Sequence, residues 1–239
     1  MNEKFCCGDG LFFGQGEWEF NSDVSKVFQS HAVKSIPGYK EVHGLVLDIC
    51  RVLDTTGKEK VEILDIGCSL GELENTILSQ WGDSRVHITA VDSSKSMIDN
   101  IICYDERAVF LCDTADNVLS KGKKYDVIIC LYTCQFMSSG DIENFHVKVR
   151  SCLNDGGVFI LADKFEADDA DVDSVREMRL YDFKMDSGYS IEEIVGKKKA
   201  LIGVQRRLKE SYLSDISNLF SSYKLLDVSL NFICAVFYV

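Results

Sequence analysis

The chain has 239 residues, of which 46% are hydrophobic and 27% charged, a composition that excludes a disordered or collagen-like protein. Its 38 acidic and 26 basic residues give a net charge of −12, so the surface as a whole repels phosphate backbones and a nucleic-acid partner is disfavoured. Ten cysteines without a C-x-x-C pair or a visible signal peptide indicate a reduced, cytoplasmic protein without a metal site, and no apolar run is long enough to cross a membrane.

The first part of the chain reads as helical. Asn21 or Ser22 can cap a helix that runs to about Val33, and the turn at 36–38, which holds the single proline, ends it. A second helix is predicted from about 40 to 53. No composition shift marks a linker, so we expect one domain over residues 1–239, with 1–56 as a helical extension or lid and 57–239 as an α/β core.

Short apolar runs then alternate with amphipathic segments, which is typical of parallel strands covered by helices on both faces. The last two runs abut too closely to hold a crossover helix and predict an antiparallel hairpin at the sheet edge. The expected fold is therefore α/β, a doubly wound, seven-stranded, mostly parallel, Rossmann-like sheet with a C-terminal hairpin. The predicted strands are 61–66, 86–91, 108–112, 125–131, 158–162, 223–230 and 231–239.

A glycine loop follows the first of these strands. Gly67 and Gly71 precede a predicted helix, so the backbone can approach a ligand at the helix N-terminus. The next strand ends in Asp92, about 20 residues after Gly71, where a carboxylate can accept hydrogen bonds from both ribose hydroxyls. The third glycine of the dinucleotide fingerprint is missing and Glu72 would repel a pyrophosphate, so the ligand should instead carry an amino-acid ammonium. After the third strand, Asp113 either accepts from an adenine amine or caps a helix.

The same loop also matches the G-x-S-x-G motif of hydrolases, with Ser69 as the nucleophile. A hydrolase needs a later acid and a later histidine on a loop. Only His87 and His146 follow the motif, and His146 falls within a predicted helix over 141–152. The sequence therefore disfavours a hydrolase.

With these features in place, the chain resembles the class I methyltransferases that bind S-adenosylmethionine (SAM), and more narrowly the carboxy-SAM synthase family. That family converts SAM and prephenate into a carboxylated cofactor used in transfer-RNA modification. The similarity runs nearly from end to end. Its motifs are W-E-F-N-S-D-V-S-K-V-F at 18–28, S-I-P-G-Y at 35–39, D-I-G-C-S-L-G at 65–71, T-C-Q-F-M at 133–137, D-K-F at 163–165, Y-D-F-K at 181–184 and G-Y-S at 188–190.

The resemblance implies a set of cofactor contacts and two departures from the family. Leu131 stands where the family has an asparagine, and the arginine expected in the last helix, 214–220, to hold the extra carboxylate is absent. Because a buried carboxylate without a cation is costly, this loss argues against a carboxylated cofactor unless Arg206 or Arg207 substitutes in a shifted register. The implied cofactor positions are Tyr39, Gly67, Cys68, Ser69, Asp92, Ser93, Asp113 and Thr114, with Leu131 at the asparagine position.

Four tyrosines near the expected pocket are the catalytic candidates, because aromatic faces can stabilise a sulfonium, although each can also serve only in packing. His31 and Lys164 are candidate bases. The hypothesis is methyl transfer from SAM to a small molecule in a biosynthetic pathway. The alternatives are an enzyme with SAM itself as substrate, by carboxylation or by cleavage to methylthioadenosine, and a non-catalytic SAM-binding module; the resemblance also implies a homodimer. The tyrosines are Tyr39, Tyr132, Tyr181 and Tyr189.

Overall fold

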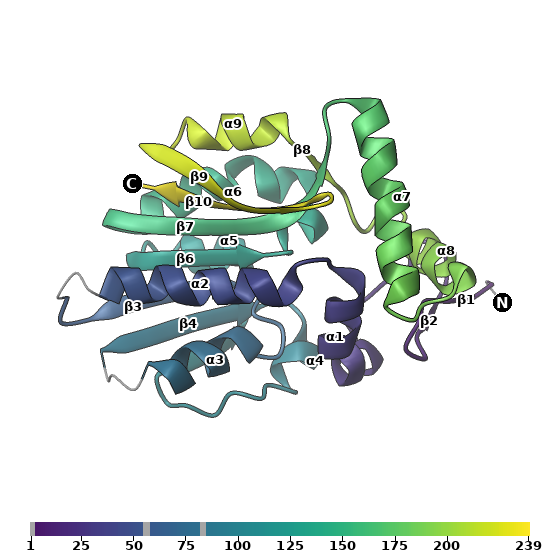
Figure 1. Cartoon of the computed structure of the whole chain (residues 1–239). Coiled ribbons are helices and arrows are strands. Elements are labelled where there is room, and N and C mark those ends of the chain that lie inside the picture. The colour runs from purple at the N-terminus through teal and green to yellow at the C-terminus, as the bar shows by residue number, and fades with distance from the viewer. Residues whose placement is uncertain (1–2, 55–57, 82–84) are drawn as a thin grey trace.

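The computed structural model describes residues 3–54, 58–81 and 85–239, and a twisted central sheet runs through it (Figure 1). The strands lie in the order β5-β4-β3-β6-β7-β10-β9, and a short β8 pairs with the end of β7. The strands of this sheet are β3 (Val61–Ile66), β4 (Val86–Asp92), β5 (Ala108–Cys112), β6 (Tyr125–Leu131), β7 (Leu153–Glu166), β8 (Leu208–Lys209), β9 (Ser222–Ser229) and β10 (Phe232–Tyr238).

Pairing within the sheet confirms the predicted topology. β3 pairs in parallel with β4 and β6, whereas β10 lies antiparallel to both β7 and β9. The structure differs from the prediction in two details: β7 is much longer than 158–162, and β8 adds an eighth, two-residue strand beside it. The extension carries the C-terminal end of β7 beyond β6, and Lys164 there pairs with Phe232 of β10.

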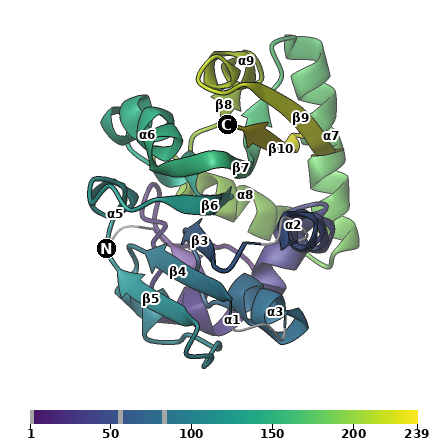
Figure 2. The ribbon, with the colours of Figure 1, turned by 90° about the vertical axis from the view of Figure 1, so that its left-hand side faces the viewer.

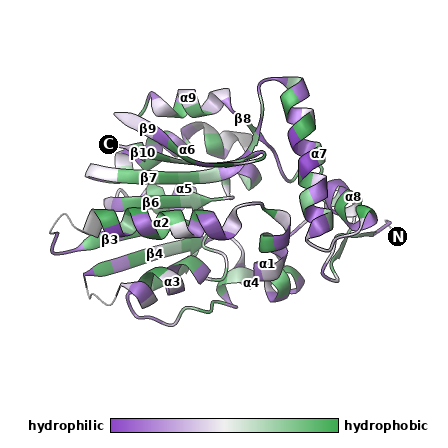
Figure 3. Ribbon diagram, in the orientation of Figure 1, coloured by the Kyte–Doolittle hydropathy of each residue, from purple (hydrophilic) through white to green (hydrophobic). Residues whose placement is uncertain are grey.

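Helices cover both faces of the sheet, as Figure 2 shows from the end. One apolar cluster joins the sheet to α2, α3 and α7, and a second joins its other face to α5, α6 and α9. The covering of both faces explains why the inner strands are continuous apolar runs (Figure 3). The helices of the chain are α1 (Ser22–Ser35), α2 (Tyr39–Asp54), α3 (Glu72–Gln80), α4 (Lys95–Ile98), α5 (Ala115–Leu119), α6 (Ser139–Cys152), α7 (Ala170–Asp186), α8 (Ile191–Ala200) and α9 (Ser211–Ser217), with a 3-10 turn at Cys134–Phe136.

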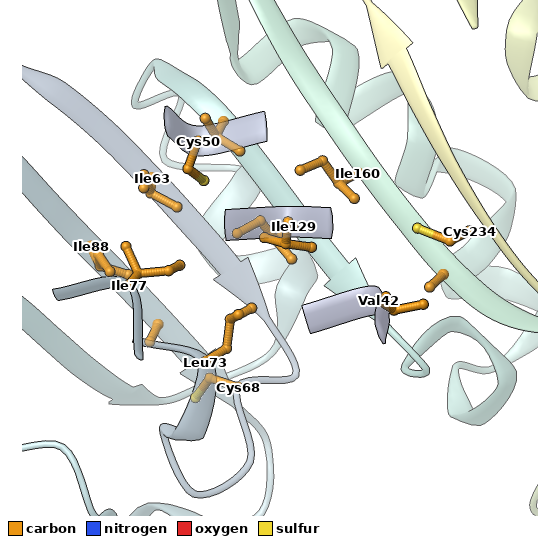
Figure 4. Packing of buried hydrophobic residues seen from close by; sticks show 14 of the residues in the cluster. Val42, Cys50, Ile63, Cys68, Leu73, Ile77, Ile88, Ile129, Ile160 and Cys234 are labelled. Atoms are coloured by element: carbon orange, nitrogen blue, oxygen red, sulfur yellow. The ribbon is translucent and has the colours of Figure 1, made fainter. Parts of the chain in front are cut away.

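The packing of α2 on the sheet illustrates the core (Figure 4). Val42 and Cys50 of α2 face Ile63 of β3, Ile129 of β6 and Ile160 of β7, and each of these five side chains is at most 3% exposed. Burying an isoleucine of this kind contributes about 1.5–3 kcal/mol to stability. The core thereby fixes α2 against the strands, and Tyr39 at its first turn lies near their carboxyl ends.

The N-terminal segment closes that end of the molecule. Asn21 caps α1, because its side chain accepts hydrogen bonds from the backbone N–H groups of Asp23 and Val24. The short strands β1 (Phe5–Cys6) and β2 (Phe12–Phe13) pair with each other and contact α8. A Cβ at Gly196 of α8 would lie 2.0 Å from the Cys6 carbonyl oxygen, so a side chain there would push the segment away. The expected division between 1–56 and 57–239 falls at residues 55–57, outside the described residues.

Candidate functional site

A cavity of about 410 Å³ lies at the carboxyl ends of β3, β4 and β6, beneath α1 and α8. Ligand pockets commonly have volumes of roughly 300–1,000 Å³. All nine sequence-predicted cofactor positions line this cavity, and they come from four different strand ends and from α2. The crevice beyond the carboxyl ends of the strands is where doubly wound sheets generally bind ligands.

The glycine loop is held open against the end of β4. Gly67 has a left-handed φ of +82°, and a Cβ there would lie 1.9 Å from Thr133 Oγ1. Asp92 secures the loop, because its Oδ2 accepts from the Ser69 N–H at 3.0 Å and its Oδ1 from the Ser94 N–H at 2.8 Å. The carboxylate has further lone pairs on the cavity side, where it can accept from hydroxyl groups of a ligand.

Acidic side chains gather next to this loop. Asp65 and Glu72 line the cavity, and Glu74 lies fully buried beside Asp65. Burial and the charge of Asp92 raise the pKa of Asp65 to about 6, whereas burial and the Asp65 carboxylate raise the pKa of Glu74 well above its usual range. Glu74 is therefore the member of the pair that holds a proton more strongly, and the negative charge on Asp65 suits a ligand ammonium.

The N-cap of α5 is Thr114 rather than Asp113, the residue for which the sequence left this role open. Both residues line the cavity, yet Asp113 Oδ1 also accepts from the Thr114 N–H and from Asn117 Nδ2, each at 2.8 Å. Thr114 is the N-cap of α5 and accepts from the Asn117 N–H. The Asp113 side chain thus stabilises the start of α5 and also lines the cavity.

The structure separates the four tyrosines into two pairs. Tyr39 and Tyr132 line the cavity and stack on each other, with ring centroids 5.6 Å apart. Tyr132 has a left-handed φ of +58°, which is strained for a side chain of this size, and its buried hydroxyl has no hydrogen-bond partner among the described residues. Tyr181 and Tyr189 do not line this cavity: Tyr189 donates to Asp9, and Tyr181 lies beneath the Lys198 ammonium, 5.5 Å from its ring centroid.

Three lysines form a further part of the cavity wall, here called the lysine wall, and no sequence motif predicted that they meet there. Lys164 of β7, Lys184 of α7 and Lys197 of α8 all line the cavity. Lys164 pairs with Glu177 at 3.0 Å, whereas the Lys184 ammonium has neither a hydrogen bond nor an ion pair within the described part of the chain. Burial and the neighbouring Lys164 lower the pKa of Lys184 to about 8. The motifs D-K-F and Y-D-F-K contained two of these lysines, but neither motif indicated that they meet.

The lysine wall places cations in the cavity, although not on the helix that the family resemblance implies. The sequence analysis sought a carboxylate-binding arginine in 214–220, but α9 packs on the opposite face of the sheet and lines no part of the cavity. Lys197 of α8 does line the cavity. Arg207 is held by Asp173, with 2.9 Å between Nη1 and Oδ2, and is also absent from the cavity lining. The three lysines of the lysine wall therefore come from β7, α7 and α8 rather than from α9.

A buried polar network holds Lys197 in place. His31 Nδ1 lies 2.7 Å from Asp9 Oδ2, and His31 Nε2 contacts the Lys197 ammonium, which also donates to Ser35 Oγ at 3.1 Å. Burial, followed by the charge of Lys197, lowers the pKa of His31 to about 3, so the imidazole is neutral. A neutral ring that donates from Nδ1 to Asp9 accepts at Nε2 from Lys197.

The contacts of His31 and Lys164 determine whether these two candidate bases can accept a proton in the cavity. Both ring nitrogens of His31 are engaged, and Lys164 is held as an ammonium by Glu177, so neither side chain presents a free basic lone pair to the cavity. Both residues do line the cavity, as positioning and charged groups rather than as bases.

Comparison with known proteins identifies similar sequences and folds. The family described as "Methyltransferase domain" matches residues 64–159. The carboxy-S-adenosyl-L-methionine synthase of Shewanella oneidensis is 31% identical over 196 residues, which cover 80% of this chain and 79% of the relative, and that of Shewanella sp. strain MR-7 is 30% identical over the same shares.

Among solved structures, the plantazolicin methyltransferase BpumL in complex with SAH and a triazolic substrate analogue has a TM-score of 0.62 at 18% identity, over 90% of each chain. The CurJ carbon methyltransferase also has a TM-score of 0.62, at 14% identity, over 89% of this chain and 58% of the other. These structures confirm the Rossmann-like fold. None of the described helices combines the length and apolar character needed to cross a bilayer.

Proposed function

The chain belongs to the carboxy-S-adenosyl-L-methionine synthase family of SAM-dependent transferases, and we propose that it brings SAM together with a small anionic co-substrate in one cavity. The observation that carries this proposal is the polarity of the cavity. Asp65, Glu72 and Asp92 line it from β3, α3 and β4, and the three lysines line it from β7, α7 and α8. One side therefore suits the ammonium and ribose of SAM, and the other suits an anion.

The residues present fit SAM. Gly67 leaves the loop backbone free of a side chain, Asp92 offers oxygens to ribose hydroxyls, and the acidic pair at Asp65 suits the amino group. The Tyr132 hydroxyl is buried without a partner, which is costly unless a ligand supplies one. When bound, SAM supplies a sulfonium that activates its methyl group for transfer or substitution.

The stacked tyrosines would flank the sulfonium. Burial raises the pKa of both Tyr39 and Tyr132, so both phenols stay neutral and present aromatic faces rather than charges. An aromatic face attracts a desolvated cation by about 2 kcal/mol in a buried site. These residues orient the cofactor and exclude water, which is most of what a transfer at an activated methyl group requires.

The lysine wall favours an anionic co-substrate and, with the family relationship, carboxyl transfer to SAM. Lys184 is an unpaired, partly buried ammonium, and a carboxylate beside it would offset its desolvation. Methyl transfer to an anionic acceptor is the second candidate, because Leu131 stands at the position where the family resemblance expects an asparagine. A non-catalytic module would be expected to have a damaged loop or ribose acid, and both are intact.

Product analysis tests the proposal. The purified protein is incubated with SAM alone, with SAM and prephenate, and with SAM and cell extract, and nucleoside products are identified by mass spectrometry, with Asp92→Ala as the inactive control. Carboxylated SAM with prephenate supports carboxyl transfer, and S-adenosylhomocysteine formed only with extract supports methyl transfer. Methylthioadenosine from SAM alone, or no detectable SAM binding, overturns the proposal.

A further inference from the structure

A second cavity, of about 240 Å³, lies between α7 and α8 and adjoins the first. The two cavities share five lining residues, and the three lysines of the wall are among them. Neither the glycine loop nor Asp92 lines the second cavity. It therefore reaches the lysine wall from the side opposite to the proposed SAM position. The shared residues are Lys164, Lys184, Lys197, Leu201 and Gln205.

The lining of this second cavity is strongly cationic. It holds four lysines and one arginine, and Glu177 is its only acidic side chain among the described residues. Glu177 forms ion pairs with three of these cations, with carboxylate oxygen to nitrogen distances of 3.0 Å to Lys164, 3.6 Å to Lys198 and 3.5 Å to Arg207. Neither Lys184 nor Lys197 has a carboxylate in direct contact. Burial, followed by the charge of Lys184, lowers the pKa of Lys197 well below its usual range, so the ammonium that remains to be balanced by a ligand is that of Lys184.

The outer rim of the cavity reaches solvent. Ile202 is 53% exposed, and the side chain of Lys198 is 65% exposed. A protein with a net charge of −12 repels small anions at long range, so an anion needs a locally positive approach. The exposed Lys198 places a positive charge at the outer rim of the cavity, and the partly buried Lys184 places another at its inner wall.

We propose that the α7–α8 cavity is the access port and outer binding site of the anionic co-substrate, separate from the mouth through which SAM binds. Carboxylate or phosphate groups would be held first by Lys198 and then by Lys184 at the shared wall. This inference rests on the proposed function, because it assigns SAM to the glycine-loop side. It predicts that port substitutions change anion binding without changing SAM binding.

The test measures binding rather than turnover. Calorimetric titrations determine the affinity for SAM and then, on SAM-saturated protein at constant ionic strength, the affinities for malonate and for inorganic phosphate. Lys198→Glu reverses a charge at the rim, and Lys184→Met removes the unpaired ammonium. The matched control is Lys199→Glu, which makes the same charge reversal at the next residue of α8, where the side chain lies over Phe5 and lines neither cavity.

We expect the two port variants to weaken binding of the preferred anion at least tenfold and to keep the SAM affinity within threefold. The control should change both affinities by less than twofold. Tighter malonate than phosphate identifies a carboxylate ligand, and the reverse identifies a phosphate. Lys184→Met should melt no lower than wild type, because it removes an unpaired buried charge.

Two results would overturn the inference. One is wild-type protein that binds SAM but neither anion, and the other is anion affinity that falls equally in Lys198→Glu and Lys199→Glu. Failure of the wild type to bind SAM at all is a different outcome, because it refutes the proposed function on which the port depends.

Discussion

Asp92 provides the sharpest test of the cofactor site. Its carboxylate accepts two loop N–H groups, from Ser69 at 3.0 Å and from Ser94 at 2.8 Å, and it faces the cavity where ribose hydroxyls would lie. Each hydroxyl bond to a charged acceptor contributes about 1.5 kcal/mol at the low end of the usual range. Two such bonds give about 3 kcal/mol, which corresponds to roughly 150-fold in affinity.

We therefore expect Asp92→Ala to weaken SAM binding roughly 150-fold and Asp92→Asn, which keeps one neutral acceptor oxygen, to weaken it roughly tenfold. Calorimetric titration with SAM and with S-adenosylhomocysteine measures both. The control is Asp99→Asn, which removes only an exposed pair with Lys95 and lines no part of the cavity. A folded Asp92→Ala variant that binds SAM within threefold of wild type would refute the assignment.

Three further predictions concern strain, the orphaned hydroxyl and pH. Gly67→Ala should lower the free energy of unfolding by about 2–4 kcal/mol in urea titrations, because it adds a clash with Thr133 to the cost of a left-handed φ. The control Gly122→Ala, at a φ of +68° and with open space around the added Cβ, should cost only about 1 kcal/mol. Equal losses in the two variants would contradict the clash. Tyr132→Phe should leave the free energy of unfolding within about 1 kcal/mol of wild type, since the hydroxyl has no partner among the described residues. It should lower turnover about tenfold, and unaltered turnover would show that the hydroxyl does not contact the substrates. Burial lowers the pKa of His146 to about 4 in the folded chain. Between pH 6.5 and pH 4 the unfolded chain is therefore protonated at this residue and the folded chain is not, so the free energy of unfolding falls as the pH falls through this window. In urea titrations at pH 7 and pH 4, the loss of unfolding free energy between the two pH values should be about 3 kcal/mol smaller in His146→Gln than in wild type. An equal loss in the variant and in wild type would show that His146 does not cause the pH dependence.

The sequence by itself determined the local structure and the cofactor loop. The run over β3 is apolar at four of its six positions, with Ile63 and Leu64 adjacent, as expected for a strand that is covered on both faces, and its bounds match the prediction. Asn21 caps α1 because a side-chain oxygen one residue before a helix reaches the first free N–H groups. Gly67 and Asp92 lie at the ends of adjacent parallel strands, so the chain spacing alone was enough to place them together.

Only the tertiary structure decided the other half of the cavity. Lys164, Lys184 and Lys197 come from a strand and two helices, and no periodicity relates them. Their meeting depends on how α7 and α8 pack against the end of β7, whereas α9, where a cation was sought, lies on the other face of the sheet. Tyr189 turns toward Asp9 rather than into the cavity for the same reason. Spacing along the chain governs groups on one element or on paired strands, but convergence of side chains from separate helices is set by packing, which local sequence does not encode.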